Sequence, residues 1–148
     1  TLAYDELFNE TMLLYCGAQH ALFGADPPGM GWDELRTHHF AGLGYHSPNM
    51  EISQQVRLPR KATGYDQESI ATLILSGKYL GFLPDHYAQA FVRNGQMCAV
   101  KPELFHYACS FFSIVRRSPQ PSRVTRAFHD CLLKAHGSAV AAMNIYEK

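Results

Sequence analysis

The strongest fold signal in the chain is the segment Ser69-Ile-Ala-Thr-Leu-Ile-Leu-Ser-Gly77-Lys-Tyr-Leu-Gly81-Phe-Leu-Pro84. Its first half spaces apolar residues as an amphipathic helix does, and Gly77 supplies the left-handed turn that stops such a helix. In the short apolar run that follows, Gly81 lets a strand pass close to a neighbour. Pro84 then suits the first turn of another helix. The segment therefore predicts a helix, a buried strand and a second helix in immediate succession.

The rest of the chain continues this alternation of strands and helices. Apolar runs with β-branched or aromatic members predict strands at residues 10–17, 40–45, 79–83, 96–100 and 104–115. Amphipathic spacing and capping residues predict helices at 32–38, 48–57, 67–76, 84–92 and 122–137. In the last helix we expect Val124, Phe128, Cys131 and Leu132 to face inward. Strands that alternate with helices over short connections imply an α/β fold with a largely parallel sheet.

Composition favours a packed domain over one that binds nucleic acid by itself. Hydrophobic residues make up 47% of the 148 residues and charged residues 18%, which is enough apolar material for a core. Basic and acidic residues each number 13, so the chain lacks the basic surplus of isolated DNA-binding domains. No apolar run approaches the roughly 20 residues that cross a bilayer, and no membrane partner is expected. The four cysteines form no CxxC pair, which favours reduced thiols in the cytoplasm.

The segment from Ser69 to Pro84 resembles a hallmark of the effector domains of LysR-type transcriptional regulators. In that family a helix ends in Gly, a short strand with a second Gly follows, and Pro opens the next helix. Residues 13–22 resemble the strand and His-containing turn that begin the second lobe, and residues 32–40 resemble the helix and strand that come next. Arg116, Arg117 and the helix at 124–133 are similar to the return into the first lobe. The order and spacing of these segments are more specific than any one of them.

This resemblance implies a fold like that of type 2 periplasmic binding proteins, with one complete lobe plus the returning strand and helix of the other. It assigns 1–14 to the end of the first lobe and the crossover, 15–100 to the second lobe, 101–137 to the return, and 138–148 to a C-terminal tail. The sequence leaves open whether this tail extends the last helix or frays. The family's N-terminal winged helix-turn-helix, linker helix and opening of the first lobe have no counterpart here. We therefore interpret the chain as N-terminally truncated. We expect it to self-associate, because such a fragment exposes sheet edge and apolar surface.

The resemblance also implies a function. The chain would be the effector-sensing part of a DNA-binding transcriptional regulator in the cytoplasm, binding a small metabolite, with an anion favoured, in a cleft between the lobes. DNA would be contacted only through the missing N-terminal domain, the regulator would be a homo-oligomer, and no cofactor is expected. The alternative is the solute-binding protein of a transport system with the same lobes, which predicts a signal peptide and a longer chain.

The candidate ligand site is the place where predicted strands pass into predicted helices. A helix N-terminus offers free amide donors and a positive dipole end, which suit a carboxylate, sulfate or phosphate. Simpler roles remain open, because Ser47 and Asp66 are good N-caps and Phe82 suits a core. His46 could be an exposed turn residue, and Tyr65 could pack between loops. The nine candidates are Gly44, Tyr45, His46, Ser47, Asn49, Tyr65, Asp66, Phe82 and Pro84.

Catalytic and metal-binding patterns are missing from the sequence. There is no GxSxG, HExxH or P-loop motif. Cys16 and His20 have CxxxH spacing, but no second pair lies at zinc-finger distance. The other histidines are scattered, and His38 and His39 are adjacent, a poor arrangement for one metal. We therefore expect no catalytic residue and no metal ligand. A small metal-dependent enzyme stays a third alternative, which metal analysis would test.

Overall fold

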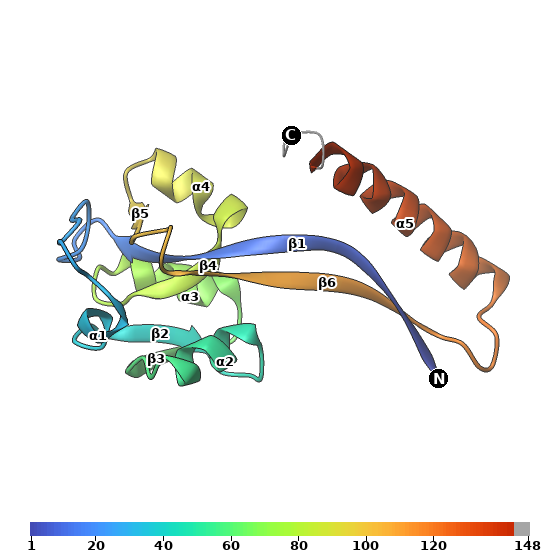
Figure 1. Ribbon diagram of the computed structural model, residues 1–148, viewed down its shortest axis with the longest axis horizontal. Helices are drawn as coiled ribbons and strands as arrows, with labels where there is room; N and C mark the ends of the chain where they lie inside the picture. Colours follow the sequence, from blue (N-terminus) through green and yellow to red (C-terminus); the bar gives the residue numbers. More distant parts are fainter. Residues whose placement is uncertain (144–148) are drawn as a thin grey trace. The chain divides into compact units, whose positions relative to one another are not determined.

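The computed structural model describes the backbone of residues 1–143 and the side chains of residues 1–136. The chain forms two compact units, drawn in Figure 1. Unit 1 consists of Thr1–Glu10 and the chain from Ala108 onwards, and unit 2 consists of Thr11–Tyr107. Strands β1 (Leu2–Gly17) and β6 (His106–Arg116) contribute to both units. The lobe expected at residues 15–100 falls inside unit 2.

The sheet of unit 2 is mixed, so the prediction of a largely parallel sheet is only partly right. Strands β2 (Phe40–Leu43) and β3 (Arg60–Gly64) are parallel neighbours. A single parallel bridge links Phe40 to Leu80, the residue just before β4 (Gly81–Pro84). In contrast, β1 runs antiparallel to both β4 and β5 (Met97–Ala99). Helical crossovers join β2, β3 and β4 and make them parallel, whereas a long loop and one short helix lead from β1 to β2.

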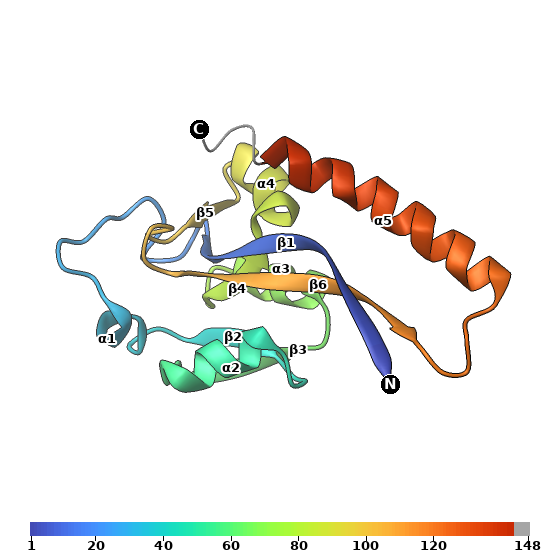
Figure 2. The same cartoon turned by 45° about the vertical axis from the view of Figure 1, so that its right-hand side comes forward.

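Four helices belong to unit 2. They are α1 (Trp32–Leu35), α2 (Pro48–Gln55), α3 (Gln67–Leu75) and α4 (Asp85–Arg93). Two of them, α2 and α3, begin after the predicted caps Ser47 and Asp66. Helix α2 lies beside β2 and β3 in both Figures 1 and 2. Gly77 has φ +73° just after α3, as its predicted turn requires. Pro84 is the N-cap of α4 rather than its first helical residue, a small correction.

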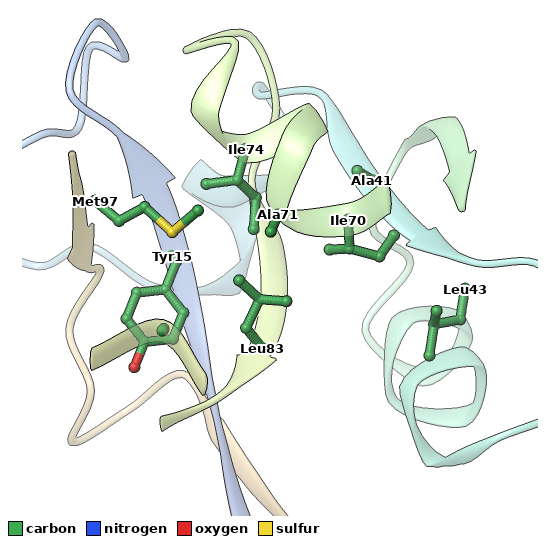
Figure 3. Packing of buried hydrophobic residues seen from close by; sticks show 9 residues of the cluster. Tyr15, Ala41, Leu43, Ile70, Ala71, Ile74, Leu83 and Met97 are labelled. Atoms are coloured by element: carbon green, nitrogen blue, oxygen red, sulfur yellow. The ribbon is translucent and has the colours of Figure 1, made fainter. Parts of the chain in front are cut away.

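The core of unit 2 lies where α3 packs on the sheet (Figure 3). A Cβ added to Gly81 would lie 2.9 Å from the Cδ1 atom of Ile74, which confirms the predicted close approach at this glycine. A Cβ on Gly17 would lie 2.3 Å from the carbonyl oxygen of Ile74, so α3 also presses against β1. The buried cluster consists of Tyr15, Ala41, Leu43, Ile70, Ala71, Ile74, Leu83, Ala88 and Met97.

Strand β3 has no counterpart among the predicted elements. Its sequence, Arg-Lys-Ala-Thr-Gly, is polar, and only Gly64 is buried. A polar segment of this kind lacks the apolar alternation by which strands are recognised. Its order comes from hydrogen bonding with β2, a contact that local sequence does not encode.

Unit 1 contains the first part of β1, most of β6 and helix α5 (Arg123–Met143). The ring of Phe8 stacks on Phe111 with centroids 4.7 Å apart and on His136 at 5.2 Å. On the same ribbon, the Oδ2 atom of Asp5 lies 3.3 Å from Nε2 of His129. None of the helices in the described residues is long and apolar enough to cross a membrane.

The last helix differs from its prediction in where it ends and in which side chains it buries. It does not stop at residue 137 but continues to Met143, which is the extension that the sequence left open beside fraying; residues 144–148 lie outside the described part. Val124 and Phe128 are 80% and 69% exposed, and Cys131 is also exposed, although all three were expected to face inward. Of the four residues predicted to face inward, only Leu132 is half-buried. Unit 1 offers the helix a two-stranded ribbon, which covers too little of it to bury that stripe.

Candidate functional site

Three helix N-termini gather at one edge of the sheet of unit 2. Strands β2, β3 and β4 run in the same direction and end at Leu43, Gly64 and Pro84. Helices α2, α3 and α4 begin within a few residues of these strand ends. The edge is also where the chain enters the unit, because Met12 pairs with Pro84. The turn after Gly44 and the segment from Gly77 to Pro84 therefore belong to one unit, as predicted. In open α/β sheets, ligands bind at this kind of edge.

Two of the predicted residues that lie far apart in sequence are brought into contact. The backbone N–H of Gly44 donates to the carbonyl of Gly64 over 2.8 Å. A Cβ on Gly44 would lie 2.7 Å from Cε1 of Tyr65, so the tyrosine ring covers the glycine. Tyr65 is 71% exposed and Tyr45 is 45% exposed. Both aromatic rings therefore stand at the surface of this edge, where a bound molecule can reach them.

Asn49 is the buried polar residue of the site. It is 2% exposed, and its Oδ1 accepts a 3.0 Å hydrogen bond from the backbone N–H of Leu43. This bond ties the first turn of α2 to the end of β2. The Nδ2 group of the same side chain is buried and has no hydrogen-bond partner among the described residues. Buried polar groups are usually satisfied, so an unpaired donor here calls for an explanation.

Ser47 and Asp66 both act as helix caps, and the two caps differ in charge. The Oγ of Ser47 accepts a 3.3 Å hydrogen bond from Met50 N–H, which leaves its own hydrogen free to donate. The Oδ1 of Asp66 accepts a 2.7 Å hydrogen bond from Ser69 N–H. Hydrogen bonding from Ser69 holds the pKa of Asp66 below its usual value, so the carboxylate stays charged. The N-terminus of α3 already carries an anion, whereas that of α2 is capped by a neutral group.

His46 is an exposed residue at the same turn. Its Nε2 lies 3.1 Å from Oε1 of Glu51, and their side chains are 83% and 63% exposed. Exposed pairs of this kind contribute little to stability. The contact nevertheless gives Glu51, in the first turn of α2, a partner.

Phe82 and Pro84 lie in the core rather than at the surface. The Phe82 side chain is 1% exposed, and its ring centroid lies 5.0 Å from that of Tyr107 and 6.0 Å from that of Phe40. Pro84 is also buried. These two residues form the layer beneath the strand ends.

Arg60 is a residue of the site that sequence reasoning missed. Its Nη1 donates a 3.1 Å hydrogen bond to the carbonyl of Leu43, the residue whose N–H is bound by Asn49. The aliphatic part of the side chain runs along β2, since a Cβ on Gly42 would lie 3.1 Å from Cδ of Arg60. Arg60 begins β3, and without that strand in the prediction no signal linked it to the turn.

A separate cavity lies in unit 1, and its lining includes none of the nine candidates. Its volume is about 330 Å³, and its lining includes Arg116, Arg117, Arg126 and His129. Over the described residues, no group of three or more His, Cys, Asp or Glu side chains is arranged to hold a metal ion.

Comparisons with known proteins agree on one family. Residues 1–137 match the sequence model described as "LysR substrate binding domain". The chain is 33% identical over 127 residues to the HTH-type transcriptional activator BauR of Pseudomonas aeruginosa. That alignment covers 86% of this chain and 42% of BauR, so the chain spans less than half of that relative.

Solved structures show the same fold at low identity. The full-length HypT of Salmonella typhimurium, a hypochlorite-specific LysR-type transcriptional regulator, superposes with a TM-score of 0.72 and 12% identity, over 93% of this chain and 47% of HypT. The regulatory domain of CcmR from Synechocystis PCC6803, in complex with 2-PG, gives 0.71 and 15%, over 91% and 67%. These likenesses confirm the predicted α/β fold of the periplasmic-binding-protein type.

Proposed function

This chain belongs to the LysR substrate binding domain family, and on that premise we propose that it is the effector-sensing part of a DNA-binding transcriptional regulator. The names of the similar proteins support a regulator over the solute-binding protein of a transport system. DNA contact would come from a helix-turn-helix domain outside this chain, and the regulator would act in the cytoplasm. The gene sequence upstream of Thr1 tests this directly, because a reading frame without a helix-turn-helix contradicts it.

The proposed effector is a small anionic metabolite bound at the N-terminus of α2. The observation that carries this proposal is the buried, unpaired Nδ2 donor of Asn49 in the first turn of that helix. Free amides and the helix dipole favour an anion at such a place. The hydroxyl of Ser47 and the guanidinium of Arg60 add a donor and a positive charge beside it.

The neighbouring residues would set the shape and selectivity of the site. Tyr45 and Tyr65 would form aromatic walls, and Gly44 leaves room for the Tyr65 ring. His46 would supply a further donor, whereas the charged Asp66 at the cap of α3 would repel an anion and confine it to the α2 side. Phe82 and Pro84, being buried, would support the strand ends from below rather than contact the effector.

Regulation would follow from differential affinity. An effector shifts an equilibrium between two conformations only by as much as it binds one of them better. The contact of α2 with β2 through Asn49 and Leu43 is one place where a bound anion would change local hydrogen bonding. The complex of the CcmR regulatory domain with 2-PG supports a small ligand in this family.

The site can be tested by following amide shifts in nuclear magnetic resonance spectra while titrating 2-PG, inorganic sulfate and a set of small carboxylates. We expect saturable shifts at the amides of residues 44–50 and at the Asn49 side-chain amide. Arg60→Gln should weaken binding by about tenfold or more, because hydrogen bonds between charged groups are worth roughly 1.5–3 kcal/mol.

Arg93→Gln is the matched control, because Arg93 is an exposed arginine in the last turn of α4. Its affinity for every probe should equal that of the unsubstituted chain. Shifts that cluster elsewhere, or equal weakening by both substitutions, would contradict binding at α2.

We also propose that the chain self-associates through unit 1. Several large apolar side chains of this unit are open to solvent, among them Phe111, Phe112 and Ile114 at 41%, 48% and 56% exposed. Open apolar surface of this kind is typical of association surfaces. Light scattering should therefore give a mass above that of one chain. A monomer at all concentrations would contradict this proposal and leave the effector site untouched.

A further inference from the structure

Two of the four cysteines lie side by side on neighbouring strands of unit 2. Strands β1 and β5 are antiparallel, and their register places Cys16 directly opposite Cys98. Side chains of directly opposed residues project on the same side of a sheet. The two Sγ atoms are accordingly only 3.4 Å apart, although 82 positions separate the residues in sequence.

This arrangement matches the backbone geometry of a disulfide. The Cα atoms of opposed residues in an antiparallel pair lie about 4.5–5.5 Å apart, and disulfides bridge Cα separations of about 4.4–6.8 Å. Small side-chain rotations would therefore bring the sulfur atoms from contact to bonding distance.

The two thiols differ in their surroundings. Cys16 is fully buried, and desolvation raises the pKa of its thiol far above the usual range. Cys98 is only half-buried, and its Sγ accepts a 3.3 Å hydrogen bond from Gly24 N–H in the loop after β1. An oxidant therefore reaches Cys98 first, while Cys16 stays protonated beside it.

We propose that Cys16 and Cys98 are a reversible thiol-oxidation site that closes an intramolecular disulfide between β1 and β5 in response to a hydroperoxide. The Cys98 sulfur attacks one oxygen of hydrogen peroxide, the O–O bond breaks, and Cys98 becomes a sulfenic acid. The other oxygen takes the proton of the Cys98 thiol and leaves as water. The Cys16 sulfur, losing its proton, then attacks the Cys98 sulfur. The S–O bond breaks, the oxygen takes that proton and leaves as a second water. Two thiols are oxidised by two electrons, and one peroxide is reduced.

The bond would tie β1 to β5 within unit 2. It would close a loop containing α1 to α4 and β2 to β4, which lie between the two cysteines in sequence. Closing a long loop lowers the conformational entropy of the unfolded chain. The oxidised form should therefore unfold at a higher temperature than the reduced form.

The experiment is to treat the reduced, folded chain with hydrogen peroxide, block the remaining thiols with iodoacetamide, and digest it for mass spectrometry. We expect a peptide pair joined through Cys16 and Cys98, lighter by two hydrogen atoms and separated again by dithiothreitol. Non-reducing electrophoresis should show this linkage within single chains. The melting temperature should rise by at least about 5 °C on oxidation.

The other cysteines provide matched controls. Cys98→Ser should abolish the linked pair, whereas Cys131→Ser, at an exposed position in α5, should leave it intact. Two results on the unsubstituted chain would overturn the proposal without any variant. One is recovery of Cys98 as a sulfinic or sulfonic acid beside an alkylated Cys16. The other is oxidation of Cys131 alone, with the pair unreactive.

Discussion

Unit 2 and unit 1 share two strands yet differ in how much apolar surface they bury. Among the described residues, every buried hydrophobic side chain except Leu7 belongs to unit 2. In unit 1, Ile114 and Phe128 remain 56% and 69% exposed. The same strand β1 is therefore mostly buried from Met12 to Gly17, whereas before Met12 every residue except Leu7 is exposed or half-buried. The burial of a strand depends on what packs against it, and its own sequence does not decide this.

The difference in burial follows from how many helices and strands pack together in each unit. In unit 2, helices α2, α3 and α4 pack on a sheet of several strands, and the core lies between them. In unit 1, one helix accompanies a two-stranded ribbon. A two-stranded ribbon has too little surface to be stable by itself. Unit 2 should therefore carry most of the stability of the chain, and unit 1 should be the part that depends on association.

The largest test of this contrast compares two phenylalanines. Phe82→Ala should lower the free energy of unfolding by about 3–5 kcal/mol, because it empties a buried space between Phe40 and Tyr107. Phe112→Ala, at a side chain 48% exposed, should cost about 0.5 kcal/mol or less. Urea denaturation at low protein concentration measures both. Equal losses would mean that the side chains of unit 1 are buried as well as those of unit 2. That result would contradict the difference in burial between the two units.

A smaller difference in stability is expected when one hydrogen bond is removed from each unit. Asn49→Ala leaves the buried Leu43 N–H without its acceptor and should cost about 1–3 kcal/mol. Ser110→Ala removes a 2.6 Å hydrogen bond to Asn9, which is exposed, so water can replace it. Its cost should be about 0.5 kcal/mol or less. Urea denaturation measures the free energy of unfolding of both variants. A larger loss for Ser110→Ala than for Asn49→Ala would contradict the expected ranking.

The smallest expected effect is a dependence of the stability of unit 2 on pH. The rings of His20 and His38 lie 5.1 Å apart, and burial lowers the pKa of each imidazole from its usual value of 6.5. The charge of His38 is the second cause for His20, and the charge of His39 is the second cause for His38. The unfolded chain then binds more protons than the folded unit as pH falls through 6.5, so stability falls there and is regained at higher pH. We expect His38→Asn to reduce the loss between about pH 7.5 and 5.5.

His46→Asn serves as the control, because His46 is an exposed histidine of the same unit. Thermal unfolding at each pH gives the comparison. A loss of stability that is unchanged in His38→Asn would show that another group causes it.

Much of the candidate site could be predicted because its signals are local. A serine or an aspartate before an apolar repeat identifies a helix start, and Ser47 and Asp66 both cap as expected. The partners of those residues could not be predicted in the same way. Arg60 reaches the Leu43 carbonyl only because β3 lies beside β2, and β3 has no recognisable strand pattern.

The sequence by itself determined the alternation of strands and helices apart from β3, the caps Ser47 and Asp66, and the glycine that ends α3. These features depend on interactions within a few residues, so the local chemistry of the chain is sufficient. The tertiary structure alone decided the direction of β1, the exposure of α5, and the meeting of Cys16 with Cys98. Each of these depends on segments that are distant in sequence, and their proximity is set by the packing of the whole unit.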